Sequence, residues 1–260
     1  MSETISTEQV NLNSQPPAVD RFDSLRRLKQ TPSTFGLIGF TLLVYATQVL
    51  SLELTGRDFV ILYGAKINEA IVAGEVWRLV TPLLVHAGLL HVFVNMYSLY
   101  ALGPAVERLF SSKRMLAIYL LSGISGVVFS LGFSPNPSVG ASGAIFGLLG
   151  ALGTFIYRHR SRLGRAGKLQ LRQIILVILL NLGLLGLMPQ IDNWGHFGGL
   201  LAGIALTWTL GPQLDVSLSE GQRPKLVDQR PWHKVRVSTL LAAGLLAVLA
   251  FAATFSPFVR

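Results

Sequence analysis

The chain has 260 residues, of which 51% are hydrophobic and only 13% are charged, and its mean hydropathy is +0.52. This composition is typical of a protein that crosses a membrane several times. The net charge of +9 could indicate nucleic-acid binding, but the Lys and Arg residues lie between apolar segments, so no nucleic acid is expected as a partner. Cysteine is absent, which excludes disulfides, a thiol nucleophile and thiolate metal sites.

The N-terminal segment, 1–34, is polar throughout. It contains Pro16-Pro17, and its acidic residues are Glu3, Glu8, Asp20 and Asp23. It therefore matches neither a signal peptide nor an acid-poor transit peptide. The sequence predicts a flexible cytoplasmic tail.

Seven apolar segments follow, each close to the roughly 20 residues that cross a bilayer. They lie at 35–53, 83–103, 114–133, 141–157, 171–189, 194–211 and 238–256. The first six make up a core at 35–211, and a cytoplasmic linker at 212–237 joins it to a further helix at 238–260. The prediction is an all-α polytopic membrane protein with a six-helix core and one additional C-terminal transmembrane helix.

Positive charge alternates between the connections of these segments. Lys and Arg occur in the tail and in the connections that follow the second, fourth and sixth segments, whereas 134–139 and 190–193 contain none. By the positive-inside rule, the N-terminus is cytoplasmic and the C-terminus lies outside. We expect a multi-pass protein of a bacterial inner membrane. The long connection at 54–82 carries apolar patches and Trp77, and predicts an element on the outer leaflet.

The second, fourth and sixth segments share one direction, from outside to inside. This places five polar side chains in the outer half of the bilayer: His86, His91, Asn95, Ser142 and His196. Ser142 lies within Gly140-Ala141-Ser142-Gly143, fifty-four positions before His196. A histidine in hydrocarbon is costly unless it has a partner or a task. We interpret Ser142 and His196 as a nucleophile and its base.

His91 and Asn95 are four residues apart and so share one face of a helix. Two donors on one face suit an oxyanion hole, and a helix that begins at Ser142 adds backbone N–H donors. The alternative is that His91 and Asn95 form hydrogen bonds between helices, as polar residues in membrane spans commonly do.

Glycines recur at helical spacing beside both Ser142 and His196. They are Gly143, Gly147 and Gly150 in the fourth segment and Gly195, Gly199 and Gly203 in the sixth. Small residues every fourth position let two helix backbones approach closely. Such an approach could bring the hydroxyl and the imidazole together, although these glycines could serve helix packing alone.

These motifs together resemble those of the rhomboid intramembrane serine proteases. The run 140–143 is similar to their G-x-S-G motif, 196–203 to H-x-x-G-x-x-x-G, and 86–95 to H-x4-H-x3-N, while Trp77-Arg78 resembles a pair in their first loop. The resemblance covers about 75–210, with the motifs in the family's order.

The resemblance implies a serine endopeptidase that cleaves transmembrane segments of membrane protein substrates near their outer end, without metal or cofactor. Ser142 is the implied nucleophile, His196 the general base, and His91, Asn95 and the Ser142 amide the oxyanion site. His86 is expected near the active-site mouth. Phe146 takes the place of a tyrosine that in many members stacks on the catalytic histidine.

Several alternatives remain at this stage. Asp192 lies four residues before His196 and could complete a triad, although a role as helix cap is the simpler reading. A zinc hydrolase would use His86, His91 and His196, but there is no H-E-x-x-H motif, and His86 and His91 would point about 140° apart on one helix. A catalytically inactive relative that binds membrane helices is the main alternative. A transporter lacks an acidic residue at a predicted midplane.

Overall fold

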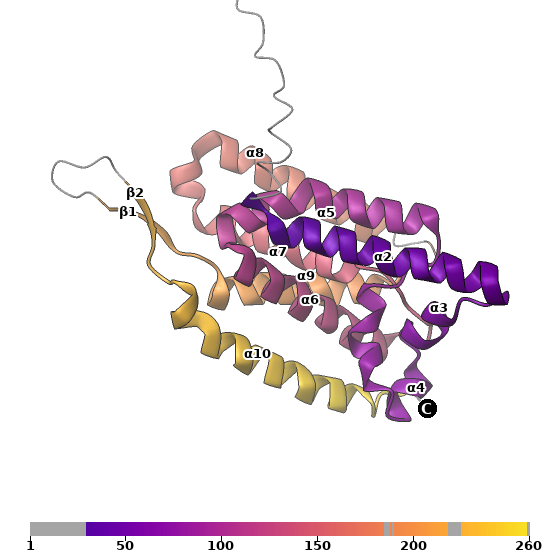
Figure 1. The fold of residues 1–260 in the computed structure, drawn as a ribbon. Coiled ribbons are helices and arrows are strands. Elements are labelled where there is room, and N and C mark those ends of the chain that lie inside the picture. Colours follow the sequence, from indigo (N-terminus) through magenta and orange to yellow (C-terminus); the bar gives the residue numbers. More distant parts are fainter. Residues whose placement is uncertain (1–29, 185–187, 189, 218–224, 259–260) are drawn as a thin grey trace, which may run out of the picture.

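The computed structural model describes residues 30–184, 188, 190–217 and 225–258. Long helices lie side by side in a bundle (Figure 1): α2 (Pro32–Thr55), α5 (Leu89–Phe110), α6 (Ser112–Phe133), α7 (Ser142–Arg158), α8 (Arg160–Leu179), α9 (Asn193–Leu210) and α10 (Trp232–Ala253). Shorter elements join them: α3 (Phe59–Gly64), α4 (Asn68–Val72), η1 (Val76–Leu79), η2 (Thr81–Leu83), η3 (Leu180–Leu184), β1 (Leu214–Ser217) and β2 (Lys225–Asp228).

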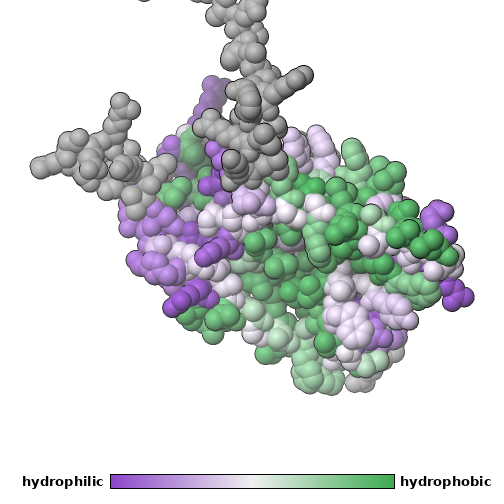
Figure 2. Space-filling view, in the orientation of Figure 1, coloured by the Kyte–Doolittle hydropathy of each residue, from purple (hydrophilic) through white to green (hydrophobic). Residues whose placement is uncertain are grey.

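The expected fold class, an all-α polytopic membrane protein, is confirmed. Each of the seven predicted spans overlaps a long helix, and five of these helices, α2, α5, α6, α8 with its extension, and α10, are long and apolar enough to cross a membrane. The glycine-rich α7 is apolar but has only 17 residues. Figure 2 shows an apolar band across this face of the molecule, with hydrophilic residues gathered at its ends. Leu90 of α5 is 76% exposed, as a side chain in contact with lipid would be.

The core is built around α7, which packs against both α6 and α9. Leu148 of α7 is fully buried, as are Leu99 of α5 and Ile118 of α6. Because α7 is enclosed by other helices, its short length and small residues suit close packing rather than contact with lipid.

Helix α2 begins at Pro32, so the expected tail at 1–34 ends earlier than predicted. The carboxylate of Glu107 accepts hydrogen bonds from the backbone N–H groups of Ser33 and Thr34, each at 2.8 Å, and one from the Thr34 hydroxyl at 2.7 Å. Glu107 thereby satisfies N–H groups that the first helical turn leaves without partners. Residues 1–29 lie outside the described part of the chain.

The basic stretch after α7 was expected to be a loop, and this expectation is wrong. It forms the first turns of α8, which starts at Arg160 and is interrupted at Gly164, where φ is +56°. Arg, Lys, Leu and Gln are good helix formers, so the positive charges extend the helix beyond its apolar part.

The expected linker at 212–237 is partly a β-hairpin, in which β1 and β2 pair antiparallel, and α10 starts within it at Trp232. An ion pair of 2.6 Å between Arg114 and Asp228 holds the hairpin to the start of α6. Arg162 and Asp215 form a second, exposed pair of 3.0 Å. Residues 218–224 are not among those described.

The first connection, 54–82, folds around the buried guanidinium of Arg78. It donates to the carbonyl oxygens of Ala65 at 2.7 Å and Leu62 at 3.0 Å and pairs with Glu75 at 2.6 Å. The connection therefore has an ordered polar centre of its own, in addition to apolar patches that the sequence suggested would face a leaflet.

Candidate active site

Ser142 is the first residue of α7, directly after a turn that requires glycine. Gly140 has φ +118°, a conformation that other residues rarely adopt, and its N–H donates to the carbonyl of Pro82 at 2.8 Å. The turn fixes the direction in which α7 starts, so the Ser142 hydroxyl lies at the N-terminal end of that helix.

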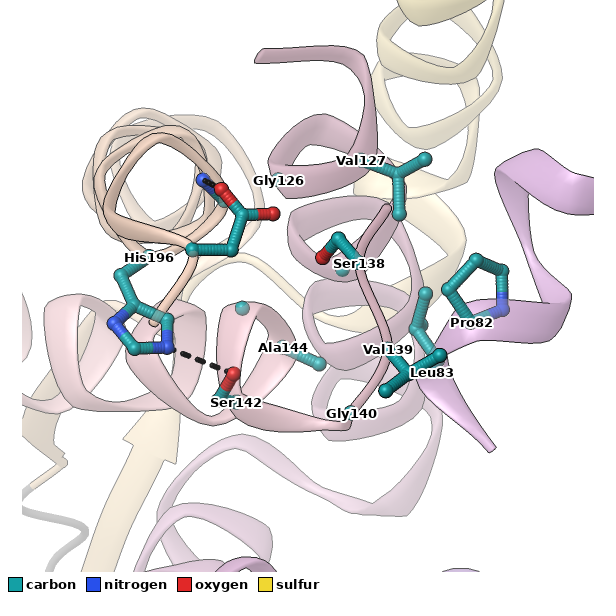
Figure 3. Close-up of a pocket in the computed structure, with 14 residues that line it drawn as sticks. Pro82, Leu83, Gly126, Val127, Ser138, Val139, Gly140, Ser142, Ala144 and His196 are labelled. Atoms are coloured by element: carbon teal, nitrogen blue, oxygen red, sulfur yellow. Dashed lines mark hydrogen bonds between the residues drawn. The ribbon is translucent and has the colours of Figure 1, made fainter. Parts of the chain in front are cut away.

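His196 lies in the first turn of α9, which begins at Asn193. Its Nε2 is 2.8 Å from Oγ of Ser142, within hydrogen-bond distance (Figure 3). The Phe146 ring, one turn after Ser142, stacks on the imidazole with a centroid distance of 4.5 Å and an interplanar angle of 14°. The imidazole is thus held between the serine and an aromatic face.

Helices α7 and α9 contact each other along their rows of glycines. A methyl group placed on Gly199 would overlap the carbonyl oxygen of Gly143, and one placed on Gly203 would overlap that of Gly147. Similarly, a methyl on Gly150 would lie 2.7 Å from the carbonyl oxygen of Leu200. Gly195 continues the row, since a methyl on Gly143 would lie 3.2 Å from its carbonyl oxygen. The two backbones are in direct contact, which sets the spacing between Ser142 and His196.

Asp192 caps α9 through a hydrogen bond that its Oδ1 accepts from the backbone N–H of Gly195 at 2.9 Å. Its backbone carbonyl accepts from the His196 N–H at 3.1 Å, but within the described residues its carboxylate makes no hydrogen bond to the His196 imidazole. The Nδ1 atom of His196 is buried and has no hydrogen-bond partner within the described residues. In this geometry the carboxylate serves the helix end rather than the imidazole.

His91 and Asn95 lie next to the turn that precedes Ser142. A methyl on Gly140 would lie 2.7 Å from Nε2 of His91 and 3.9 Å from Nδ2 of Asn95. The Asn95 amide also donates to the carbonyl of His91 at 2.9 Å. The Ala87 N–H lies 3.5 Å from Nδ1 of His91, a contact that favours the tautomer with its proton on Nε2, the nitrogen that faces Gly140.

His86 was expected within the second span, and this expectation is wrong. Helix α5 starts only at Leu89, after an extended Gly88, so His86 belongs to the preceding loop. Its ring meets that of His91 edge to face at 5.1 Å. The backbone of His86 is held by Gln48 of α2, which accepts from its N–H at 3.0 Å and donates to its carbonyl at 2.9 Å.

His86 and His91 therefore do not share a helix, and the predicted divergence of about 140° between them does not apply. The zinc alternative gains nothing from this change. Over the described ranges, no three His, Asp or Glu side chains are grouped as ligands of a metal ion.

Lys66 is a residue that the sequence analysis missed. It is fully buried, and its Nζ donates to three carbonyl oxygens, those of Ser130 at 3.2 Å, Ser134 at 2.9 Å and Asn136 at 2.9 Å. Its backbone pairs with Ser138 through two hydrogen bonds. Lys66 therefore connects the first loop to the segment that leads into Ser142. The sequence offered only a weak signal, a single lysine between Ala65 and Ile67.

Burial lowers the pKa of Lys66 to about 8, while the negative charges of Asp192 and Glu69 act to raise it. The ammonium group is nevertheless well supplied with acceptors, since three carbonyl oxygens surround it.

A small cavity of about 20 Å³ lies beside the serine and the histidine. Its walls come from the loop that precedes α7, from α6 and from the start of α9 (Figure 3), and include Ser138, Val139, Gly140, Ser142, Asp192 and His196. This volume is enough for one water molecule, for which about 10–15 Å³ is needed. The cavity combines polar groups with room for a small reactant.

Comparisons with known proteins identify the family of this chain. The family model of the Rhomboid domain matches residues 73–213. Rhomboid protease GluP of Bacillus subtilis (strain 168) is 39% identical over 228 residues, which are 81% of this chain and 44% of that protein. RHOMBOID-like protein 5 of Arabidopsis thaliana is 38% identical over 156 residues, 56% of this chain and 48% of that protein.

The chain spans less than half the length of either relative. The matched region nevertheless contains the serine, both histidines of α5 and α9 and the glycine rows, and it covers more than half of the chain. On these grounds, the chain belongs to the rhomboid family.

Proposed function

We propose that this protein is an intramembrane serine endopeptidase that uses Ser142 as nucleophile and His196 as general base. The observation that carries the proposal is the 2.8 Å contact between Oγ and Nε2, at the adjoining ends of two helices in backbone contact. A nucleophile and a base within hydrogen-bond reach are the arrangement that activates a serine. Family membership supports the same activity, since a relative is named a protease.

In the first step, Oγ of Ser142 attacks the carbonyl carbon of a peptide bond, and Nε2 of His196 takes the hydroxyl proton. The same nitrogen then gives this proton to the leaving amine as the C–N bond breaks, which yields an acyl-enzyme. Among the described residues, Nδ1 of His196 has no hydrogen-bond partner, and the Asp192 carboxylate accepts from the Gly195 N–H instead. Both observations support a dyad, without a carboxylate on the imidazole. Stacking on Phe146 would keep the ring in place through both proton transfers.

The negative charge that develops on the substrate carbonyl oxygen needs donors close to Ser142. We assign this role to Nε2–H of His91, the amide of Asn95 and the backbone N–H of Ser142. Both side chains lie against Gly140, two residues before the nucleophile, which supports the assignment. One donor of this kind contributes about 3–4 kcal/mol to transition-state stabilisation in other acyl-transfer enzymes.

Water must then reach the acyl-enzyme to release the second product. The cavity of about 20 Å³ beside Ser142 and His196 has room for the attacking water. His196 would take a proton from that water and return it to Oγ of Ser142, which restores the starting state. A polar cavity enclosed by helices keeps lipid away from this reaction.

The proposed substrates are single-span membrane proteins, cleaved near the outer end of their transmembrane segment. The carbonyl groups of an intact helix are engaged in hydrogen bonds, so small or helix-breaking residues should mark the cleavage site. We further propose a bacterial inner membrane as the location, with the N-terminus in the cytoplasm and the C-terminus outside. The distribution of Lys and Arg supports this orientation.

The test is reconstitution with a single-span substrate and mass spectrometry of the products. Wild type should cut the substrate at one or a few bonds close to one end of its span, and Ser142→Ala should give no product. A fluorophosphonate should label wild type at Ser142, and His196→Ala should abolish that labelling. If the folded wild type binds the substrate without cutting it, the protein is the inactive helix-binding relative instead.

A further inference from the structure

Helix α10 packs against the bundle formed by α6 and α9 at both of its ends. Between these ends, a groove separates α10 from α6 and α9. At the α9–hairpin end, Val235 is buried in the core and Trp232 packs beside it. At the other end, the Ser256 hydroxyl donates to the Gly132 carbonyl at 2.6 Å, and Asn68 donates to the Phe258 carbonyl at 2.9 Å. Figure 1 shows α10 running along the edge of the bundle between these two ends. Both ends of α10 are thus held to the rest of the bundle.

The groove has a volume of about 520 Å³. Its walls are made mostly of apolar side chains from three helices: Ser125 and Phe129 of α6, Leu201, Ala202, Ala205, Leu206 and Thr209 of α9, and Ser238, Leu241, Ala242, Leu245, Leu246 and Leu249 of α10. Leu241 and Leu245 are 69% and 60% exposed, so the groove opens outward.

Water is a poor occupant of this groove. Two of the three hydroxyls in the wall are already engaged: that of Ser125 donates to the carbonyl of Gly198 at 3.1 Å, and that of Thr209 donates to the carbonyl of Leu206 at 3.1 Å, which leaves Ser238. A water molecule needs two to four polar partners, and apolar cavities without them stay dry. The occupant is therefore apolar.

The dimensions of the groove distinguish between two candidate apolar occupants, a helix and a lipid chain. A helix with its side chains is about 10 Å across, so it would enter this outward-open groove with only part of its surface. From Ser238 to Leu249, in contrast, the groove runs along eleven residue steps of α10, about 16 Å. This length is about half of the roughly 30 Å hydrocarbon core, the depth of one leaflet.

Positive charge marks one end of the groove. The guanidinium of Arg230 donates to the carbonyls of Trp208 and Thr209, at 3.0 and 2.6 Å, and Thr209 is part of the groove wall. Lys234 precedes Ser238 by four residues and so lies on the same face of α10, one turn beyond the groove. The groove is apolar, about as deep as one leaflet, and has two cations at one end. This combination complements a phospholipid, whose acyl chain is apolar and whose phosphate is negatively charged.

We infer that this groove binds one acyl chain of a phospholipid whose phosphate lies between Arg230 and Lys234. The lipid fills the space between α10 and the rest of the bundle and so completes the packing of the seventh long helix. Its binding does not depend on the proposed peptidase activity.

The experiment uses the full chain in vesicles that contain phosphatidylglycerol with a photoreactive group in mid-chain. After illumination, peptide mass spectrometry should find the label on groove residues such as Leu245 and Ala242. The variant with both Ala205→Phe and Ala242→Phe fills the groove and should lower this labelling at least about tenfold, a loss of about 1.4 kcal/mol. Leu240→Phe is the matched control, because Leu240 is 71% exposed and is not part of the wall.

A second pair of variants tests the phosphate. Lys234→Gln should weaken labelling severalfold, whereas Arg236→Gln should not, because position 236 points to another side of α10. A photoreactive diacylglycerol, which lacks phosphate, should label the groove less than phosphatidylglycerol does. Equal labelling by both lipids would overturn the phosphate site. Uniform labelling around α10 in wild type, or a crosslink there to a membrane-protein helix, would overturn the lipid groove even if the filled variant fails to fold.

Discussion

Gly199 on α9 and Gly143 on α7 touch through their backbones, because the space for a side chain on Gly199 is taken by the carbonyl oxygen of Gly143. A carbonyl within a helix cannot move aside on its own. The contact therefore ties the position of His196, one turn before Gly199, to that of Ser142, the neighbour of Gly143.

Gly199→Ala should push α7 and α9 apart. We expect the free energy of unfolding to fall by about 1–3 kcal/mol, as for other overpacked cores, and turnover to fall by at least about tenfold as the serine and histidine separate. Thermal unfolding in mild detergent and cleavage of a reconstituted substrate measure the two effects. Gly244→Ala is the control, because nothing lies within 4 Å of that position, and it should leave both quantities near wild type. Full turnover in Gly199→Ala would contradict the coupling.

Phe146→Leu should lower turnover by about two- to tenfold, because a stacked aromatic pair contributes about 0.5–1.5 kcal/mol beyond the area it buries. Phe146→Tyr preserves the ring that stacks on His196 and should retain activity. The measurement is kcat at saturating substrate. A tyrosine variant as impaired as the leucine variant would show that stacking is not what matters at this position.

Asp192→Asn should remain active, because asparagine can cap α9 as aspartate does, whereas Asp192→Ala should lower stability by about 1 kcal/mol. Turnover should fall only as far as the loss of stability in each variant explains. In both variants it should stay far above the turnover of Ser142→Ala. Cleavage assays and unfolding curves on the same preparations separate the two effects. Collapse of turnover in a fully folded Asp192→Asn would establish a triad in place of the dyad.

Lys66→Met should remove the ammonium group that donates hydrogen bonds to three carbonyl oxygens, and so loosen the loop ahead of Ser142. We expect kcat to fall severalfold, and Lys66→Arg to restore part of it if the new guanidinium reaches the same oxygens. The comparison of kcat with KM at neutral pH measures this. Unchanged kcat in Lys66→Met would show that the loop is held well enough by its backbone pairing with Ser138.

Lys66 also predicts a dependence of stability on pH. Its pKa is lowered from 10.5 to about 8 in the folded protein, chiefly by burial, so the unfolded chain binds more protons between these two values. The contribution of Lys66 to stability therefore rises as pH increases from about 8 to 10.5. Unfolding temperatures of wild type minus those of Lys66→Met should rise over this range, and a flat difference would contradict the shifted pKa.

The sequence was most informative where the structure depends on short-range spacing. The rows of glycines on α7 and α9 and the positions of Ser142 and His196 at two helix ends follow from helical periodicity, and the structure has them at those places. Family membership and the polytopic helical fold were also predictable, because motif order and hydropathy can be read from the sequence without knowledge of tertiary contacts.

What the sequence did not reveal depends on contacts between distant segments. Gln48 holds the backbone of His86 across 38 residues, and Lys66 holds Ser134 across 68. Neither residue belongs to a motif: Gln48 is a single polar residue within the predicted span 35–53, and Lys66 lies in the connection 54–82. The start of α5 was misplaced because 83–88 is apolar enough to extend a span, although extended backbone at Gly88 interrupts it. The hairpin after α9 was missed because its two strands are only four residues long.

The amide of Asn68 donates to Ser134, in the loop ahead of the serine, and also to Phe258, beyond the end of α10. During synthesis the chain emerges from its N-terminus, so Phe258 is made more than a hundred residues after Ser142. Asn68, which also donates to the loop ahead of Ser142, therefore gains its second partner only after α10 has been synthesised. In a nascent chain, this link between the first connection and the end of α10 forms late.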